Sequence, residues 1–306
     1  MNKYPLLDRE RLLERLALPS GPADVVMDTD TFNEIDDQFA VTYALLSPQL
    51  NVKALYAAPF FNTNSTSPAD GMERSYQELL RLLDRLGRSA EGMVFRGSAG
   101  YLPAKGQPVQ SDAAQDLIAK AMAQGNEPLY VLTIGCITNV ASALLLEPRI
   151  AEKIVIVWLG GHPTYWEDAR EFNLMQDVPA AQVIFDSGVP LVLMPCINVT
   201  EHLRTTLPEI EAYVKGRGAI GDYLYETYRN CHDDHFAYSR VIWDISAVAF
   251  MNDPSWTPTR IEPSPVLRDD ITWGPNDPAR HPVRIAYRMN RDAIFRDLFS
   301  KLAANA

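Results

Sequence analysis

Acidic side chains are concentrated in one short stretch of the chain. Five carboxylates fall within ten residues, at Asp28, Asp30, Glu34, Asp36 and Asp37. Carboxylates held this close repel one another, so a fold that gathers them needs a bound cation, hydroxyl donors, or both. Hard oxygen ligands of this kind favour Ca²⁺ or Mg²⁺ over zinc. The stretch therefore predicts a site for a metal ion or a polyol.

The position of this stretch supports the same interpretation. A short apolar run ends in Asp28 and Asp30, and a polar turn then leads to a helical pattern over residues 36–46. Singly, these acids have simpler explanations: turn residues, Asp36 as a helix cap, and Asp37 in the favourable first turn. Together they follow a predicted parallel strand, at the edge where open α/β sheets bind their ligands.

The stretch resembles the signature of the inosine–uridine nucleoside hydrolase family, Asp-x-Asp-Pro-Gly-x-Asp-Asp. Here the Pro-Gly turn is absent, and five residues rather than three separate Asp30 from Asp36, which indicates a divergent branch. The resemblance implies calcium-dependent hydrolysis of ribonucleosides to free base and ribose. In that reaction Asp30 would be the catalytic base and a Ca²⁺ ligand, Asp37 a Ca²⁺ ligand, and Asp36 a ribose ligand.

Two further turns follow predicted strands in the order expected for this family. Residues 133–139 resemble the family's Gly-x-Leu-Thr-Asn turn, which implies that the backbone carbonyl of Ile134 binds calcium. A plain strand-to-helix turn, capped by Thr138 or Asn139, explains the same residues. Asn62 follows the second predicted strand, where the family has a ribose-binding asparagine.

A third stretch resembles the family's Glu-Phe-Asn segment, whose Glu and Asn bind ribose hydroxyls. It contains Glu171, Phe172 and Asn173. On an extended segment, side chains two residues apart point the same way, so Glu171 and Asn173 would offer acceptors and donors to a diol. Taken alone, Glu171 would be a surface acid. A further family asparagine, expected several residues earlier, is absent, and residues 165–168 stand near its place.

The last motif, Trp243-Asp244, precedes an apolar helical pattern. Asp244 matches the family's late calcium-binding aspartate, and its simpler explanation is a helix cap. Many family members have histidine at the position of Trp243, where it assists the departing base. We expect Trp243 to stack on the base instead. His232 or His235, in a loop that could close over the pocket, would donate a proton or a hydrogen bond.

Composition limits the class of protein. A chain of 306 residues with 47% hydrophobic and 22% charged residues is typical of a folded globular protein. The formal net charge of −11 argues against nucleic acids and anionic membrane surfaces as partners. Residues 1–18 lack the apolar core of a signal peptide, and no apolar run is long enough to span a membrane. Few, widely spaced cysteines fit packing roles in a reducing compartment. We therefore expect a cytoplasmic homodimer or homotetramer that acts on a small-molecule nucleoside.

Strands and helices are predicted to alternate along most of the chain. Apolar runs predict strands over residues 24–29, 52–58, 93–95, 129–133, 154–159, 189–194 and 283–289. Helical spacing predicts helices over residues 8–17, 36–46, 72–86, 113–123, 139–146, 180–187 and 291–303. The remaining stretches are irregular (162–177), mainly helical (207–252) and Pro-rich and loop-like (253–282). This alternation predicts an α/β fold with an open, mainly parallel, Rossmann-like sheet and helices on both faces. We expect one domain over residues 1–306, with residues 1–23 as an N-terminal helical extension.

Two other functions fit parts of the pattern. Residues 28–31 also resemble the Asp-x-Asp-x-Thr loop of haloacid-dehalogenase-like phosphatases, in which Asp28 would be the nucleophile and the ion Mg²⁺. The adjacent Asp36-Asp37 pair, and the lack of a convincing downstream lysine followed by an acidic pair, count against that function. A non-catalytic nucleoside- or sugar-binding protein with a structural calcium is the third alternative. Hydrolysis of ribonucleosides is the function that we expect.

Overall fold

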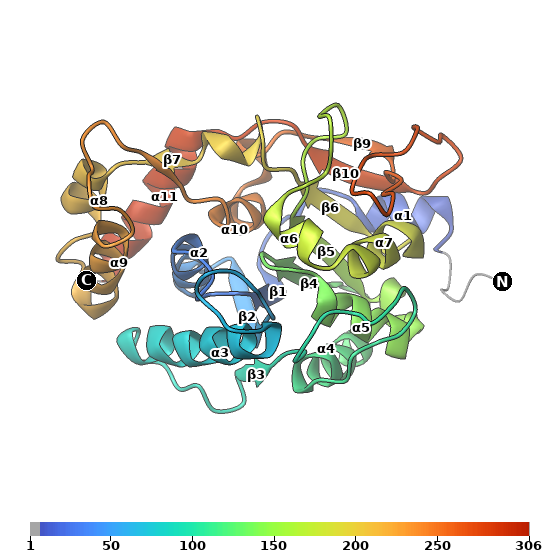
Figure 1. Cartoon of the computed structure of the whole chain (residues 1–306), viewed down its shortest axis with the longest axis horizontal. Coiled ribbons are helices and arrows are strands. Elements are labelled where there is room, and N and C mark those ends of the chain that lie inside the picture. The colour runs from blue at the N-terminus through green and yellow to red at the C-terminus, as the bar shows by residue number, and fades with distance from the viewer. Residues whose placement is uncertain (1–6, 306) are drawn as a thin grey trace.

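A twisted, mainly parallel sheet runs through the protein (Figure 1). The computed structural model describes residues 7–305. Within them, eight strands form this sheet in the order β3-β2-β1-β4-β5-β6-β10-β9, and only β9 runs antiparallel to its neighbour. The strands are β1 (Ala23–Thr29), β2 (Leu50–Ala57), β3 (Val94–Arg96), β4 (Leu129–Thr133), β5 (Ile154–Leu159), β6 (Leu191–Met194), β9 (Thr259–Pro263) and β10 (Pro282–Ala286).

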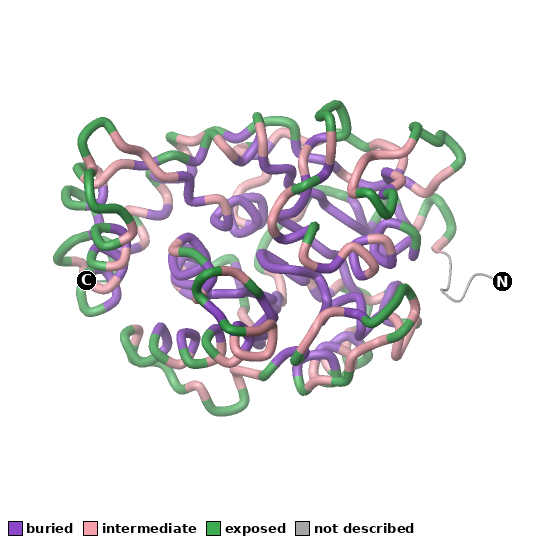
Figure 2. Tube along the Cα trace, in the orientation of Figure 1, coloured by how far each residue is buried: buried purple, intermediate pink, exposed green. Residues whose placement is uncertain are grey.

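Helices cover both faces of the sheet, because both faces of its central strands are apolar. In β1, Val25 and Met27 join the core under one layer of helices, and Val26 joins the core under the other. The first layer includes α2 (Asp36–Leu46), α3 (Pro68–Arg85), α10 (Ile245–Asn252) and α11 (Arg291–Ala304). The second includes α4 (Asp112–Ala123), α5 (Thr138–Leu146) and α7 (Val178–Ser187). Figure 2 shows the buried residues running through the centre of these layers. The predicted fold class is confirmed.

Three stretches differ from the prediction. The mainly helical stretch 207–252 contains α8 (Leu207–Tyr213), α9 (Gly218–Arg229) and α10, but also β8 (Arg240–Val241), which pairs with β7 (Arg204–Thr205). The irregular stretch 162–177 ends in the short helix α6 (Phe172–Gln176). The loop-like stretch 253–282 contains the edge strand β9. Half-exposed edge strands and two-residue bridges lack a strong apolar pattern, so distant pairing partners define them.

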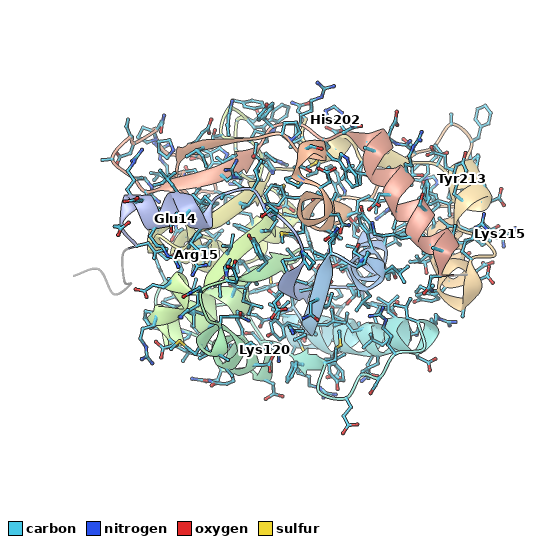
Figure 3. All side chains as sticks on the ribbon, turned by 180° about the vertical axis from the view of Figure 1, so that it is seen from behind. Glu14, Arg15, Lys120, His202, Tyr213 and Lys215 are labelled. Carbon is cyan, nitrogen blue, oxygen red and sulfur yellow. The ribbon has the colours of Figure 1, made fainter. Side chains whose placement is uncertain are left out.

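The described part of the predicted N-terminal extension contacts β10 and the loops that precede β4 and β5, and its first six residues lie outside the described part of the chain. Helix α1 (Arg9–Arg15) is capped by Asp8, whose carboxylate accepts a hydrogen bond from the backbone of Arg11. Arg15, labelled in Figure 3, donates to the carbonyls of Asn126 and Glu152, which precede β4 and β5. None of the helices between residues 7 and 305 has the length and apolarity that a membrane crossing requires.

The strand order creates a crevice beside β1. The chain leaves β1 toward β2 on one side and later returns to form β4 on the other side. At such a switch point, the loops that follow the two strands diverge, and ligands bind outside the carboxyl ends of the strands. Asp30 directly follows β1 and Ile134 directly follows β4, so the two residues lie at the edges of this crevice.

Candidate functional site

A pocket of about 310 Å³ opens at the carboxyl edge of the sheet. It combines residues from the β1–α2 turn, the β4–α5 turn, the loop that leads into α6, and the segment before α10. Eight of the eleven site residues predicted from the sequence line this pocket: Asp30, Asp36, Asp37, Ile134, Glu171, Asn173, Trp243 and Asp244. Asn62, His232 and His235 are not among its lining residues.

Four aspartates form what we call the carboxylate cluster: Asp30, Asp36, Asp37 and Asp244. Asp36, Asp37 and Asp244 each offer an oxygen, and these oxygens lie within 4.8 Å of one another. All four aspartates are at most 3% exposed. Both carboxylate oxygens of Asp30 are buried, and no hydrogen-bond donor in residues 7–305 satisfies them. Buried carboxylates without donors are costly unless they are protonated or bind a cation, so the cluster suits a cation.

The pKa values of the carboxylate cluster also favour a bound cation. Burial raises the pKa values of Asp30, Asp36 and Asp244 well above the ordinary range, and the neighbouring carboxylates raise them further. Burial raises the pKa of Asp37 to about 7, even though the Thr29 hydroxyl donates to its Oδ1 at 2.5 Å. A divalent cation would reverse these shifts, because it stabilises the charged form of each ligand.

The backbone of the β1–α2 turn places Asp36 and Asp37 at the start of α2. Asp36 and Asp37 are the first two residues of α2, where free backbone N–H groups favour negative charge. The simpler explanation of Asp36 as the cap of this helix is wrong, because the cap position belongs to Ile35 and has no side-chain hydrogen bond. Asp36 Oδ2 instead accepts a hydrogen bond from the backbone N–H of Trp243 at 3.2 Å. This bond joins the turn to the segment that carries Asp244.

The side chain of Asp244 is not used to cap its helix, so it can face the other aspartates of the carboxylate cluster. It occupies the cap position of α10, but its side chain makes no capping hydrogen bond. Nearby, Arg240 forms an ion pair with Glu34 at 2.7 Å, and Glu34 lines the pocket. Arg240 therefore links the same two segments a second time, and its charge lowers the pKa of Asp36 against the larger effect of burial.

The β4–α5 turn lies very close to Asp30. A Cβ atom on Gly135 would lie 3.0 Å from Cγ of Asp30, so glycine permits this approach. Neither Thr138 nor Asn139 caps α5, since Ile137 holds the cap position without a side-chain bond. Asn139 instead donates to Oδ1 of Asp28 at 2.7 Å. The simpler explanation, in which Thr138 or Asn139 caps the helix, is therefore wrong.

The Glu-Phe-Asn segment is extended only at Glu171 and is helical from Phe172 onward, which corrects the expected geometry. Glu171 caps α6 by accepting hydrogen bonds from the backbones of Asn173 and Leu174, and also from Gly161 at 2.7 Å. Burial raises the pKa of Glu171 to about 7. Asn173 lies inside the helix and donates its Nδ2 to the carbonyl of Ile134 at 3.0 Å. A carbonyl oxygen has two lone pairs, so this bond leaves Ile134 able to bind a cation as well.

The three remaining residues have other partners. Asn62 donates its Nδ2 to Oδ1 of Asn33. His232 and His235 lie in the loop between α9 and β8, where His232 stacks on Tyr238 with ring centroids 4.2 Å apart. His235 donates through Nε2 to the carbonyl of Arg229 at 2.9 Å.

Sequence reasoning missed several residues that line the pocket. They are Asn33, Leu159, His162, Arg170, Cys196 and Ile197, and Glu34 and Phe172 were named in the motifs but given no role. His162 directly follows Gly160-Gly161 at the carboxyl end of β5, and that placement was a usable signal. It is half-buried, and burial lowers its pKa. Cys196 was expected only to pack in the core.

An open parallel sheet that gathers buried carboxylates at its switch point belongs to the class of α/β proteins with a cation-binding ligand pocket. The family profile described as "Inosine-uridine preferring nucleoside hydrolase" matches residues 25–296. The chain therefore belongs to this family, as its sequence motifs indicated.

Relatives and solved structures agree with this assignment. The chain is 31% identical to the pyrimidine-specific ribonucleoside hydrolase RihA of Salmonella paratyphi A over 221 residues. The match spans 65% of this chain and 66% of that protein, just under two thirds of its length. The plant nucleoside hydrolase PpNRh1 has a similar fold, with a TM-score of 0.73, 22% identity, and coverage of 92% of this chain and 99% of that one. The purine-preferring ribonucleoside hydrolase of Gardnerella vaginalis gives a TM-score of 0.71 at 20% identity, with coverage of 92% and 98%.

Proposed function

We propose that this protein hydrolyses the N-glycosidic bond of ribonucleosides with the help of Ca²⁺. The observation that carries the proposal is the carboxylate cluster, in which Asp30 lies buried without a hydrogen-bond donor. The names of the relatives support nucleosides as the substrate class. They divide between pyrimidine-specific and purine-preferring enzymes, so we assign no base.

The donor set fits calcium. Asp30, Asp37 and Asp244 would supply carboxylate oxygens, and Ile134 would supply its backbone carbonyl. Calcium takes six to eight oxygen ligands at roughly 2.3–2.6 Å, and water and sugar hydroxyls would complete that number. The three-carboxylate group contains no nitrogen or sulfur donor, which disfavours zinc.

The chain's own groups account for most of the reaction. Breaking the N-glycosidic bond develops positive charge on the sugar, and the buried carboxylates stabilise that charge. A bound divalent cation would lower the pKa of a coordinated water and orient it. Asp30 would accept the proton of the attacking water. Asp36, Glu171 and Asn173 would hold the ribose, and Trp243 would stack on the base.

The phosphatase alternative conflicts with the structure. Its nucleophile would be Asp28, which is fully buried and does not line the pocket. Asp28 accepts hydrogen bonds from Asn139 and from the hydroxyl of Thr133 at 3.3 Å. Burial raises its pKa to about 7, which further disfavours a carboxylate nucleophile. Family membership argues the same way.

A nucleoside screen tests the proposal. Purified protein should release reducing sugar from at least one ribonucleoside, and a chelator should abolish the release until Ca²⁺ is added back. Asp37→Asn should lose activity and calcium binding together. Phosphate release from phosphorylated substrates would favour the phosphatase instead. Tight nucleoside binding with no sugar release would favour a binding protein. A homodimer or homotetramer, one domain and a cytoplasmic location remain part of the proposal, and sedimentation would measure the oligomeric state.

A further inference from the structure

Asn33 is a pocket residue in the part of the turn where this chain departs from the family signature. It lies between Asp30 and Asp36, in the spacing that is two residues longer than usual. Asn33 is only 7% exposed, and it lines the pocket together with the carboxylate cluster. A buried amide needs partners for both its oxygen and its nitrogen, so its bonds can be accounted for completely.

Three hydrogen bonds fix the position of Asn33. Its backbone N–H donates to the carbonyl of Asp30 at 2.7 Å. Its backbone carbonyl accepts from Nδ2 of Asn64 at 2.8 Å. Its side-chain Oδ1 accepts from Nδ2 of Asn62. The loop after β2 therefore holds both the backbone and the side chain of Asn33.

The orientation of both amides follows from one backbone contact. The N–H of Asn64 donates to Asn62 at 2.8 Å and can meet only the oxygen of that side chain, which is therefore Oδ1. Asn62 then donates through its NH₂ group to Asn33, so the acceptor on Asn33 is its side-chain oxygen. The NH₂ group of Asn33 is left over, and no acceptor in residues 7–305 takes a hydrogen bond from it.

We propose that Asn33, and not Asn62, donates the amide hydrogen bond to a ribose hydroxyl, while Asn62 and Asn64 position it. This inference rests on the proposed nucleoside substrate. The ionised acids of the pocket only accept hydrogen bonds from the sugar, so each hydroxyl that donates to a carboxylate still needs a donor for its own oxygen. The Nδ2 group of Asn33 supplies such a donor in the pocket that Asp36 also lines.

Deoxynucleosides test the assignment, because a lost sugar contact changes discrimination between substrates. We would measure kcat/KM for a ribonucleoside and its 2′-deoxy and 3′-deoxy forms, using uridine or inosine, whichever the protein cleaves faster. Asn33→Ala should reduce the preference for the ribonucleoside over one of the two deoxy forms by about three- to tenfold, the usual effect of one neutral hydrogen bond. Asn62→Ala should give a smaller change, since it only frees the Asn33 amide. Asn51→Ala, an exposed asparagine bonded to Asp24, is the matched control and should change nothing.

The possible results separate this inference from the proposed function. In Asn33→Ala, an equal loss of rate on all three substrates would show a merely structural role, and no loss would show no role for this side chain. Either result would overturn the inference while hydrolysis stands. The inference would also be overturned if only Asn62→Ala, and not Asn33→Ala, changed the preference for the ribonucleoside over a deoxy form. If the protein releases no sugar, calorimetry measures substrate binding instead. Its ligands would be the uncleavable C-nucleosides pseudouridine and formycin, together with their deoxy forms. Discrimination that depends on Asn33 in this assay would support the inference, while the failure to release sugar from any ribonucleoside would by itself reject the hydrolysis. Absence of binding would reject both.

Discussion

The carboxylate cluster should make the stability of the protein depend on pH and calcium in a linked way. The perturbation is removal of divalent cations by a chelator, followed by a rise in pH from about 4 to about 8. Asp37 has a pKa of about 7 in the folded protein, against an ordinary value of 3.8. Between these two values the folded state keeps a proton that the unfolded state has lost. The free energy of unfolding therefore falls as the pH rises from about 4 to about 7, and then levels off.

The size of the effect follows from the shift. Each pKa unit corresponds to about 1.4 kcal/mol, so Asp37 alone would contribute a loss on the order of 4 kcal/mol as an upper limit. At this chain length, that loss corresponds to a fall in Tm of roughly 8 °C. Calcium binds the ionised carboxylates, so it should raise Tm more at the higher pH than at the lower pH. At a calcium concentration of about 100 times Kd, the expected gain is about 2.7 kcal/mol.

Thermal unfolding followed by circular dichroism measures these effects in buffers across the range, with chelator or with calcium. The matched control is Asp37→Asn, which keeps the shape of the side chain and removes its titration. The control also corrects for general charge repulsion in a chain of net charge −11. The pH slope in chelator and the response to calcium should both shrink in this variant. Equal slopes in the two proteins, or an equal calcium gain at both ends of the pH range, would refute the reasoning.

Three further predictions concern activity. Gly135→Ala should push the carboxylate of Asp30 by a few tenths of an ångström and lower kcat by about tenfold, with Tm as the check on folding; an unchanged kcat would contradict the close approach of this turn. Asn173→Ala should raise KM, lower kcat, or both, by a loss of about 1–3 kcal/mol, as steady-state kinetics would show. If His232 or His235 acts as the acid after loop closure, its Ala variant should slow natural nucleosides by about 10²–10⁴-fold and spare an activated nitrophenyl riboside. Unchanged rates in both variants would exclude the loop from proton transfer.

Much of the fold could be predicted from the sequence because local patterns determined it. The strands in the centre of the sheet are short, continuous apolar runs, and helices such as α4 are amphipathic and capped by a serine. Strand β9 could not be predicted in this way, since it is half exposed, contains Arg260 and Glu262, and is defined by its pairing with β10. Its hydrogen bonds are long-range, and no local pattern records them.

In the candidate site, too, features set by local sequence could be predicted and features set by distant contacts could not. The acids of the β1–α2 turn are adjacent in the sequence, and the placement of Asp244 came from the family motif rather than from local physics. The hydrogen bond between the side chains of Asn33 and Asn62 was not predictable, because it depends on which amide faces which across two loops. The helical geometry of Glu171 and Asn173 was missed for a related reason: the cap is made by Glu171 itself, and the helix has only five residues.

The hydrogen bond between Asp36 and Trp243 spans 207 residues of sequence, and this separation has a consequence for folding. As the chain leaves the ribosome, Asp30, Asp36 and Asp37 emerge long before Asp244. Until β8 and α10 are in place, the carboxylate cluster lacks one of its members, and the cation site is incomplete. We therefore expect its contacts to form late, after the rate-limiting step of folding. A cation bound there would then stabilise the protein chiefly by slowing unfolding, with little effect on the rate of folding.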